Sequence, residues 1–209
     1  LRDPVNACPW DKVQTHTSIR MNFLEEAYEA VDALDLDDPV LMCEELGDVL
    51  MQVAFHTCME QETGRFTWEQ VCDGVCQKLI ERHPNIYGTQ PGYEGITDWD
   101  ALKNKEKGRR TLADDLESVP RAMPALMRAA KLQKRAARHG AALQGADAAA
   151  LADAAENLQT AQPASAQAEQ AVGELLFAAA NLARQAGVDP EQALQKANEA
   201  FCTAAGPVA

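Results

Sequence analysis

The sequence has few aromatic residues, no long apolar run and few basic side chains, which are the features typical of β-rich folds, membrane spans and polyanion binding. Aromatic residues make up only 5% of its 209 residues. No segment alternates apolar and polar residues between turn dipeptides, which argues against a β-rich fold. No run of about 18 apolar residues is present, so we expect no membrane span. Only 19 basic side chains stand against 32 acidic ones, a formal net charge of −13. This balance argues against general affinity for DNA, RNA or anionic membranes.

Signals for secretion and for disulfide bonding are also missing. No charged and apolar leader opens the chain. Cys72 and Cys76 are four residues apart, unlike the Cys-x-x-Cys spacing of zinc and redox sites. Together with Cys43 and Cys58 they fall within apolar helical patterns, where a free thiol behaves as a small buried hydrophobe. We therefore expect structural cysteines and a reducing, cytoplasmic compartment.

Helical periodicity is what the sequence does contain, and it predicts an all-α protein. Thr67 is suited to cap a helix, and Asp189 followed by Pro190 is suited to start another. Residues 83–97 are rich in proline and glycine and are predicted to form a loop. The expected helices lie near 15–34, 39–62, 67–83, 98–108, 123–138, 148–160, 167–186 and 189–203.

Charge and composition change along the chain. Residues 1–110 hold 21 acidic and 11 basic side chains, whereas the alanine-rich remainder holds 11 and 8. Pro120 and Pro124 lie near this change, where prolines interrupt a helix. We therefore predict a first helical domain at 1–110, a linker at 111–122 and a second helical domain at 123–209.

The two halves also share an internal repeat. The segment 46–50 (LGDVL) resembles 172–176 (VGELL). The segment 68–70 (WEQ) likewise resembles 190–192 (PEQ), and a glycine at a helix end precedes each of these two, Gly64 and Gly187. The second half is therefore predicted to be a diverged copy of the first. Two long copies are typical of a duplicated helical domain rather than of a solenoid.

Four carboxylates carry most of the functional information. Glu26 and Glu29 are three residues apart on one predicted helix, and Glu45 and Asp48 are three apart on the next. This spacing places both members of a pair on one helix face. A solvated acidic face is the simpler interpretation of any single pair, but apolar residues flank these carboxylates and no Lys or Arg is close in sequence. A bound divalent cation would compensate their charge.

The ligand type indicates which cation is expected. Carboxylate oxygens suit Mg²⁺, with Mn²⁺ as the alternative. Di-iron carboxylate bundles instead use Glu-x-x-His pairs, which positions 29 and 48 do not supply. Mg²⁺ is usually held by carboxylates together with substrate phosphates. The pattern thus favours a phosphate-bearing substrate and a metal-activated water.

Residues that could bind such a substrate occur in the first half. Lys78 and Arg82 share a helix face, and Lys103 belongs to a basic run that follows Trp99. Trp10 and Trp99 are candidates for stacking on a base, although ordinary packing is the commoner role of a tryptophan. His56 and His83 are candidate acid–base groups, although a structural role is expected more often.

These residues together resemble the MazG family of nucleoside triphosphate pyrophosphohydrolases. The resemblance covers essentially the whole chain, and its motifs are specific in combination. They are Leu1-Arg2-Asp3-Pro4 with Cys8-Pro9-Trp10-Asp11-Lys12 and Gln14-Thr15, Glu25-Glu26-Ala27-Tyr28-Glu29, Glu44-Glu45-Leu46-Gly47-Asp48, Arg82-His83-Pro84, and the segment Pro124 to Arg138 as the start of a second family domain.

The resemblance implies an all-α fold of duplicated helical bundles in a homodimer or higher homo-oligomer. It implies Mg²⁺-dependent hydrolysis of nucleoside triphosphates to the monophosphate and pyrophosphate. Glu26, Glu29, Glu45 and Asp48 would be the metal ligands, and Glu25 would orient the attacking water. Further candidate substrate contacts are Trp10, Lys12, Lys78, Arg82, Trp99 and Lys103.

The second repeat departs from the family pattern. Ala154, Asn157, Ala171 and Glu174 stand where the metal ligands are expected, and Ala200 and Ala204 replace Lys78 and Arg82. We therefore predict a structural second domain and one catalytic site, with broad base specificity because stacking tolerates every base. The alternatives are a narrower dUTP- or phosphoribosyl-ATP-type pyrophosphohydrolase and a nucleotide-binding or interaction module without turnover.

Overall fold

The computed structural model describes residues 1–87, 104 and 106–206, and these residues form helices and connecting loops with no strand. The all-α prediction is thereby confirmed. The chain divides into two compact units, residues 1–97 and 98–209. Along the described part of the chain, no helix has the length and apolar character needed to cross a membrane.

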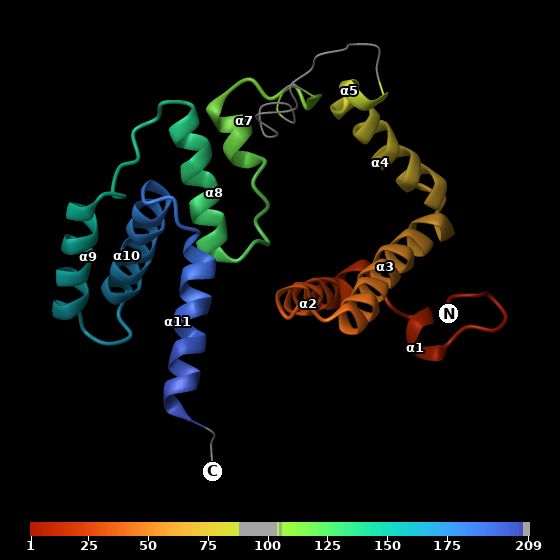
Figure 1. Ribbon diagram of the computed structural model, residues 1–209, viewed down its shortest axis with the longest axis horizontal. Coiled ribbons are helices and arrows are strands. Elements are labelled where there is room, and N and C mark those ends of the chain that lie inside the picture. Colours follow the sequence, from red (N-terminus) through yellow and green to blue (C-terminus); the bar gives the residue numbers. More distant parts are fainter. Residues whose placement is uncertain (88–103, 105, 207–209) are drawn as a thin grey trace. The chain divides into compact units, whose positions relative to one another are not determined.

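Unit 1 is built around two long helices, α2 (His16–Asp35) and α3 (Pro39–Glu62), which lie side by side (Figure 1). Thr15 begins α2 with a capping box to Ser18, and Asp38 caps α3 by accepting from two backbone N–H groups. A short helix, α1 (Pro9–Lys12), precedes the pair. Ile19, Ala30 and Ala33, which are apolar residues of α2 that flank Glu26 and Glu29, are buried.

Helix α4 (Trp68–Arg82) follows α3 after a tight turn. Thr67 caps it through a capping box with Gln70, as predicted. Gly64 has φ of 70° in the turn, a left-handed conformation that suits glycine. Pro84–Tyr87 forms the short helix α5, so the prediction that the loop begins at residue 83 is wrong. A proline is tolerated in the first turn of a helix, where its missing N–H is not needed.

Unit 2 repeats this order of helices. Helices α9 (Ala148–Thr160) and α10 (Ala166–Gln185) pack side by side, and α11 (Pro190–Ala205) follows as α4 follows α3 (Figure 1). Asp189 caps α11 as predicted. Helix α8 (Ala125–Arg138) packs on α10 and α11. The contact between α9 and α10 is lined by small side chains, among them the buried Ala154, Ala171 and Ala178.

The segment predicted as a linker contains a helix. Helix α7 (Leu112–Glu117) packs on α8 inside unit 2, and Asp115 in it is buried. Nη1 of Arg135 on α8 donates a hydrogen bond of 2.6 Å to the carbonyl oxygen of the buried Asp115 and forms an ion pair of 3.0 Å with its carboxylate. Oγ of Ser118 also bonds to this guanidinium. The boundary between the units thus falls before residue 111 rather than within 111–122. Most of the predicted helix at 98–108 lies outside the described residues, which include only 104 and 106–108 of this range.

The cysteines are less buried than their apolar surroundings predicted. Cys43, Cys58 and Cys76 are exposed and Cys72 is half-buried, all as free thiols. The expectation of buried positions is wrong because, among the described residues, no other element covers the helix faces that carry them. Leu46, Leu50 and Leu79 on the same helices are about half exposed as well, at 50%, 57% and 47%.

Candidate metal and substrate site

Three of the predicted ligands converge between α2 and α3. One carboxylate oxygen from each of Glu26, Glu29 and Glu45 lies within 4.8 Å of the other two. Among the residues that the structure describes, this is the only such group of three or more acidic, histidine or cysteine side chains. Asp48 is half-buried one turn beyond Glu45 on α3, but it is not a member of this group. Glu25 is exposed and also lies outside it.

The cluster carries uncompensated negative charge. Partial loss of water raises the pKa of the Glu29 carboxyl, and the charges of Glu45 and Glu26 raise it further. Partial loss of water likewise raises the pKa of Glu45, followed by the charges of Glu44 and Asp48. Within the described residues no Lys or Arg forms an ion pair with these carboxylates. Hard oxygen donors that repel each other this closely are suited to a divalent cation.

Gln52 supports the cluster from within the helix pair. Its side chain is buried, and Nε2 donates a hydrogen bond of 3.2 Å to Oε1 of Glu26. Sequence reasoning missed this residue, although the signal was present. Gln52 lies four residues after Asp48 on the stripe of α3 that carries Glu45.

A small cavity of about 180 Å³ adjoins Glu26 and places Trp10 beside it. Asn22, Gln52 and Phe55 also line this cavity. Trp10 is 60% exposed on α1, so its ring is available to a ligand. Lys12 on the same short helix is exposed and does not line the cavity.

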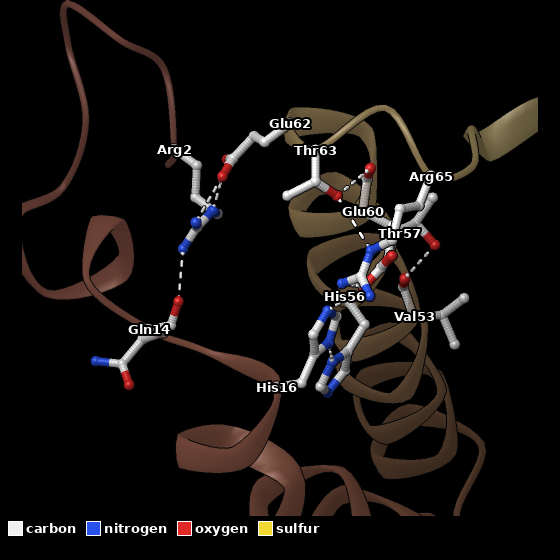
Figure 2. A network of polar contacts seen from close by, with 10 residues as sticks. All are labelled: Arg2, Gln14, His16, Val53, His56, Thr57, Glu60, Glu62, Thr63 and Arg65. Carbon is white, nitrogen blue, oxygen red and sulfur yellow. Dashed lines mark hydrogen bonds and ion pairs between the residues drawn. The ribbon is translucent and has the colours of Figure 1, made fainter.

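The N-terminal segment that carries Trp10 is anchored to the end of α3 (Figure 2). Arg2 donates two hydrogen bonds to the carboxylate of Glu62, at 2.7 and 2.6 Å, and two more to the carbonyl oxygens of Asp11 and Gln14. The hydrogen bond from Arg2 lowers the pKa of Glu62. Four bonds from one guanidinium thus fix the position of α1 relative to α3. The sequence motif Leu1-Arg2-Asp3-Pro4 contains Arg2 but did not predict this anchoring role.

A second network, shown in Figure 2, joins the start of α2 to the last turns of α3. His16 and His56 stack with ring centroids 5.0 Å apart, and their Nδ1 atoms are 2.7 Å apart. Nε2 of His16 contacts the buried Glu60 at 2.5 Å, and Arg65 pairs with the same carboxylate oxygen at 2.6 Å. Burial lowers the pKa of His56, and the neighbouring His16 lowers it further. These contacts favour a structural role for His56.

The remaining candidates lie elsewhere. Lys78 is exposed on α4, and Arg82 is its last residue. Helix α4 begins after the C-terminal end of α3, whereas Glu45 and Asp48 lie in the first half of α3. Figure 1 shows α4 running on from the C-terminal end of α3, away from its first half. His83 caps α4 and its Nδ1 lies 2.8 Å from the carbonyl oxygen of Leu79. Trp99 and Lys103 lie outside the described residues.

Fold and site together define an all-helical protein with an acidic cluster between paired helices. The family model of the MazG nucleotide pyrophosphohydrolase domain matches residues 14–87, which include the whole cluster. A nucleoside triphosphate pyrophosphohydrolase of Escherichia coli (strain K12) is 40% identical over 210 residues, 96% of this chain and 80% of that protein. The nucleoside triphosphate pyrophosphohydrolase/pyrophosphatase MazG of Thermotoga maritima is 38% identical over 203 residues, 96% of this chain and 78% of that protein.

A nucleoside triphosphate pyrophosphohydrolase of Mycobacterium tuberculosis is 38% identical over 138 residues, 64% of this chain and 42% of that protein. The chain belongs to the MazG family of nucleotide pyrophosphohydrolases. The family predicted from the sequence motifs is thereby confirmed.

Proposed function

We propose that unit 1 hydrolyses nucleoside triphosphates to the monophosphate and pyrophosphate in a Mg²⁺-dependent reaction with broad base specificity. The observation that carries this proposal is the convergence of Glu26, Glu29 and Glu45 within 4.8 Å in a member of this family. The named activity of the relatives from Escherichia coli and Thermotoga maritima supports the reaction type. Mn²⁺ is the alternative metal, since both ions prefer carboxylate oxygens.

The carboxylates would hold the metal while other side chains bind the substrate. Glu26, Glu29 and Glu45 are the proposed ligands, and Asp48 would join them. Bound Mg²⁺ would supply charge neutralisation at the phosphates and an activated water. Glu25 is proposed to orient that water. The ring of Trp10 beside Glu26 is suited to stack on a base without selecting one.

The basic residues complete the proposal. Lys78 and Arg82 would stabilise the charge that develops on the phosphates. Trp99 keeps its predicted role in base stacking, and Lys103 and Lys12 keep theirs as substrate contacts. Because α4 leads away from the cluster within one chain, Lys78 and Arg82 would reach a phosphate more readily in a homo-oligomer.

An oligomer is supported by the uncovered apolar side chains of unit 1. Leu46 and Leu50 on α3, and Val75 and Leu79 on α4, are each spaced four residues apart and are 47–57% exposed. Large exposed apolar patches are typical of protein interfaces. We therefore include a homodimer or higher homo-oligomer in the proposal. The free cysteines are consistent with a cytoplasmic location.

The second unit is proposed to be structural. Among described residues, unit 2 has no group of three converging acidic, histidine or cysteine side chains. Ala154 and Ala171, at positions where ligands are expected, are buried in the contact between α9 and α10. A methyl group at these positions packs the helices and offers no oxygen to a metal.

Release of pyrophosphate from a panel of nucleoside triphosphates, with Mg²⁺ and with EDTA, tests the proposal. We expect release from all common bases with Mg²⁺ and none with EDTA. Glu45→Ala should abolish release while helical content is retained, and Asp35→Ala, at the exposed end of α2, is the matched control. Activity on one base alone would favour a narrower dUTP- or phosphoribosyl-ATP-type enzyme. Binding without release would favour a non-catalytic module.

A further inference from the structure

Helix α8 in unit 2 is strongly basic in a protein with a net charge of −13. Its 14 residues include five basic side chains and no acidic one. Arg135 is neutralised by the buried Asp115. Lys131 and Lys134, in contrast, have no ion pair or hydrogen bond with any residue that the structure describes. No described residue of unit 2 therefore compensates their charge through an ion pair.

These two lysines line an open pocket of about 460 Å³ between α8 and the α10–α11 turn. Met127, Ala130, Lys131 and Lys134 form its wall on α8, since a spacing of three or four residues places them on one helix face. Arg184 and the turn from Gly187 to Pro190 form the opposite side. We call this cavity the α8–α11 pocket.

Arg184 is held in place by a buried amide. Its Nε donates a hydrogen bond of 2.9 Å to Oδ1 of Asn181. Asn181 is 2% exposed, and its Nδ2 donates to the carbonyl oxygen of Ala146 at 2.6 Å. The guanidinium is thus oriented before any ligand arrives, which lowers the entropic cost of binding.

The pocket has one carboxylate, and that group is already engaged. Oδ1 of Asp189 accepts hydrogen bonds from the backbone N–H groups of Glu191 and Gln192 at the start of α11. Three cations therefore face a single capping carboxylate. Such an excess of positive charge, with flexible ammonium groups and an oriented guanidinium, suits a phosphate group.

The rest of the lining is apolar and comes from Met123, Met127 and Val188. The volume exceeds what a phosphate alone fills and lies within the usual range for small-molecule sites. We propose that the α8–α11 pocket binds a nucleotide-sized phosphate ester, with the phosphate on Lys131, Lys134 and Arg184 and the apolar part on the methionines. Because no carboxylate group of the unit 1 kind is found in the described part of unit 2, this ligand is bound without hydrolysis.

Calorimetric titration of the full chain with AMP in EDTA and low salt tests the proposal. EDTA removes the metal on which turnover in unit 1 depends, so the result is independent of the proposed activity. The double variant Lys131→Gln, Lys134→Gln is expected to weaken AMP binding by about tenfold or more, because each lost charge-assisted hydrogen bond costs about tenfold. Arg184→Gln should weaken it in the same direction.

Lys196→Gln is the matched control, since Lys196 is an exposed lysine on α11 that does not line the pocket. It should bind AMP like the unmodified chain. An equal loss of AMP affinity in Lys196→Gln and in the double variant would show that net charge alone accounts for the effect, which would overturn the proposal. Unchanged binding in the double variant would overturn it as well, and so would inorganic pyrophosphate binding more tightly than AMP, because the apolar wall would then contribute nothing.

Discussion

Gln52 on α3 donates a hydrogen bond to Glu26 on α2, and the buried amide thereby ties one proposed metal ligand to the opposite helix. A carboxylate with one oxygen engaged keeps its second oxygen for a cation. Partners of this kind orient metal ligands in many proteins, and their loss typically weakens metal binding. The contact therefore connects the packing of α2 on α3 with the chemistry proposed for the cluster.

Replacement of Gln52 by Leu should weaken metal binding by about 10- to 100-fold, because Glu26 loses its orienting partner. The measurement is the Mg²⁺ concentration that gives half-maximal pyrophosphate release. At saturating Mg²⁺ most of the activity should return. Gln61→Leu, on an exposed position of the same helix, is the control and should behave like the unmodified chain. Equal Mg²⁺ requirements for the two variants would contradict the prediction.

Mg²⁺ should stabilise the fold more at pH 8 than at pH 5. Partial loss of water, and then repulsion between the carboxylates, raises the pKa values of Glu29 and Glu45. In the metal-free protein the cost of their charge is therefore present above these pKa values and is relieved as protons bind. Lower pH therefore stabilises the metal-free fold through these groups and removes the ligands that Mg²⁺ needs. We expect the thermal midpoint to rise by roughly 5 °C with Mg²⁺ at pH 8.

The difference in thermal midpoint between Mg²⁺ and EDTA, measured from pH 5 to pH 8, checks this prediction. The variant Glu29→Gln, Glu45→Gln should show no difference at any pH. A Mg²⁺ effect of the same size at pH 5 and pH 8 would contradict the argument.

His56 should contribute stability at neutral pH that is lost in acid. Its folded pKa is lowered by burial and by His16, so the unfolded chain binds the proton more readily. The contribution is full above the unfolded pKa of about 6.5 and falls as the pH drops towards the folded value. The free energy of unfolding of the unmodified chain, minus that of His56→Phe, should therefore decrease from pH 7.5 to pH 5. A constant difference would argue against a neutral, half-buried His56.

Arg2 and Glu62 should be energetically coupled. A double-mutant cycle with Arg2→Gln and Glu62→Gln should give a coupling energy of about 1 kcal/mol, near the upper end for partly exposed pairs because the contact is bidentate. Arg2→Gln should also raise the KM for the nucleotide, since it releases the segment that carries Trp10. Asp3→Asn is a control on the same segment. If the two substitutions have additive effects on the free energy of unfolding, Arg2 and Glu62 are not coupled and the proposed anchor is contradicted.

Charged residues on the uncovered face of unit 1 should disrupt self-association. The variant Leu50→Glu, Leu79→Glu places two carboxylates among the exposed apolar side chains of α3 and α4. Light scattering after size-exclusion chromatography should report one chain per particle for this variant and two or more for the unmodified protein. Val5→Glu, at an 86% exposed position outside these helices, should keep the larger mass. Identical masses for the unmodified chain and the double variant would contradict the prediction.

Most helices could be predicted from local signals. Thr67 and Asp189 cap the helices expected of them, and the apolar faces of α2 and α3 account for the buried Ile19 and Ala33. Helix α7 was missed because only six residues carry its pattern, and its stability depends on Arg135 twenty residues further on. Local sequence cannot report such a contact.

The part of the candidate site that could be predicted is the part encoded by the helical spacing of its carboxylates. The spacing within Glu26 and Glu29, and within Glu45 and Asp48, identified two faces, and the packing of α2 on α3 brings three of the four together. The pairing of Gln52 with Glu26 depends on the register between the helices, which sequence spacing does not report. The cysteines were placed wrongly for a related reason. An apolar helix face is recognisable in sequence, but what covers it is not.

The buried alanines between α9 and α10 make unit 2 more sensitive to enlarged side chains than to truncated ones. Ala154, Ala171 and Ala178 are at most 2% exposed, so the two helices pack through methyl groups rather than through bulky side chains. Truncation to glycine removes only a methyl group there, whereas a larger side chain would overpack the buried contact and destabilise it. Tolerated substitutions at this contact are therefore limited to small residues.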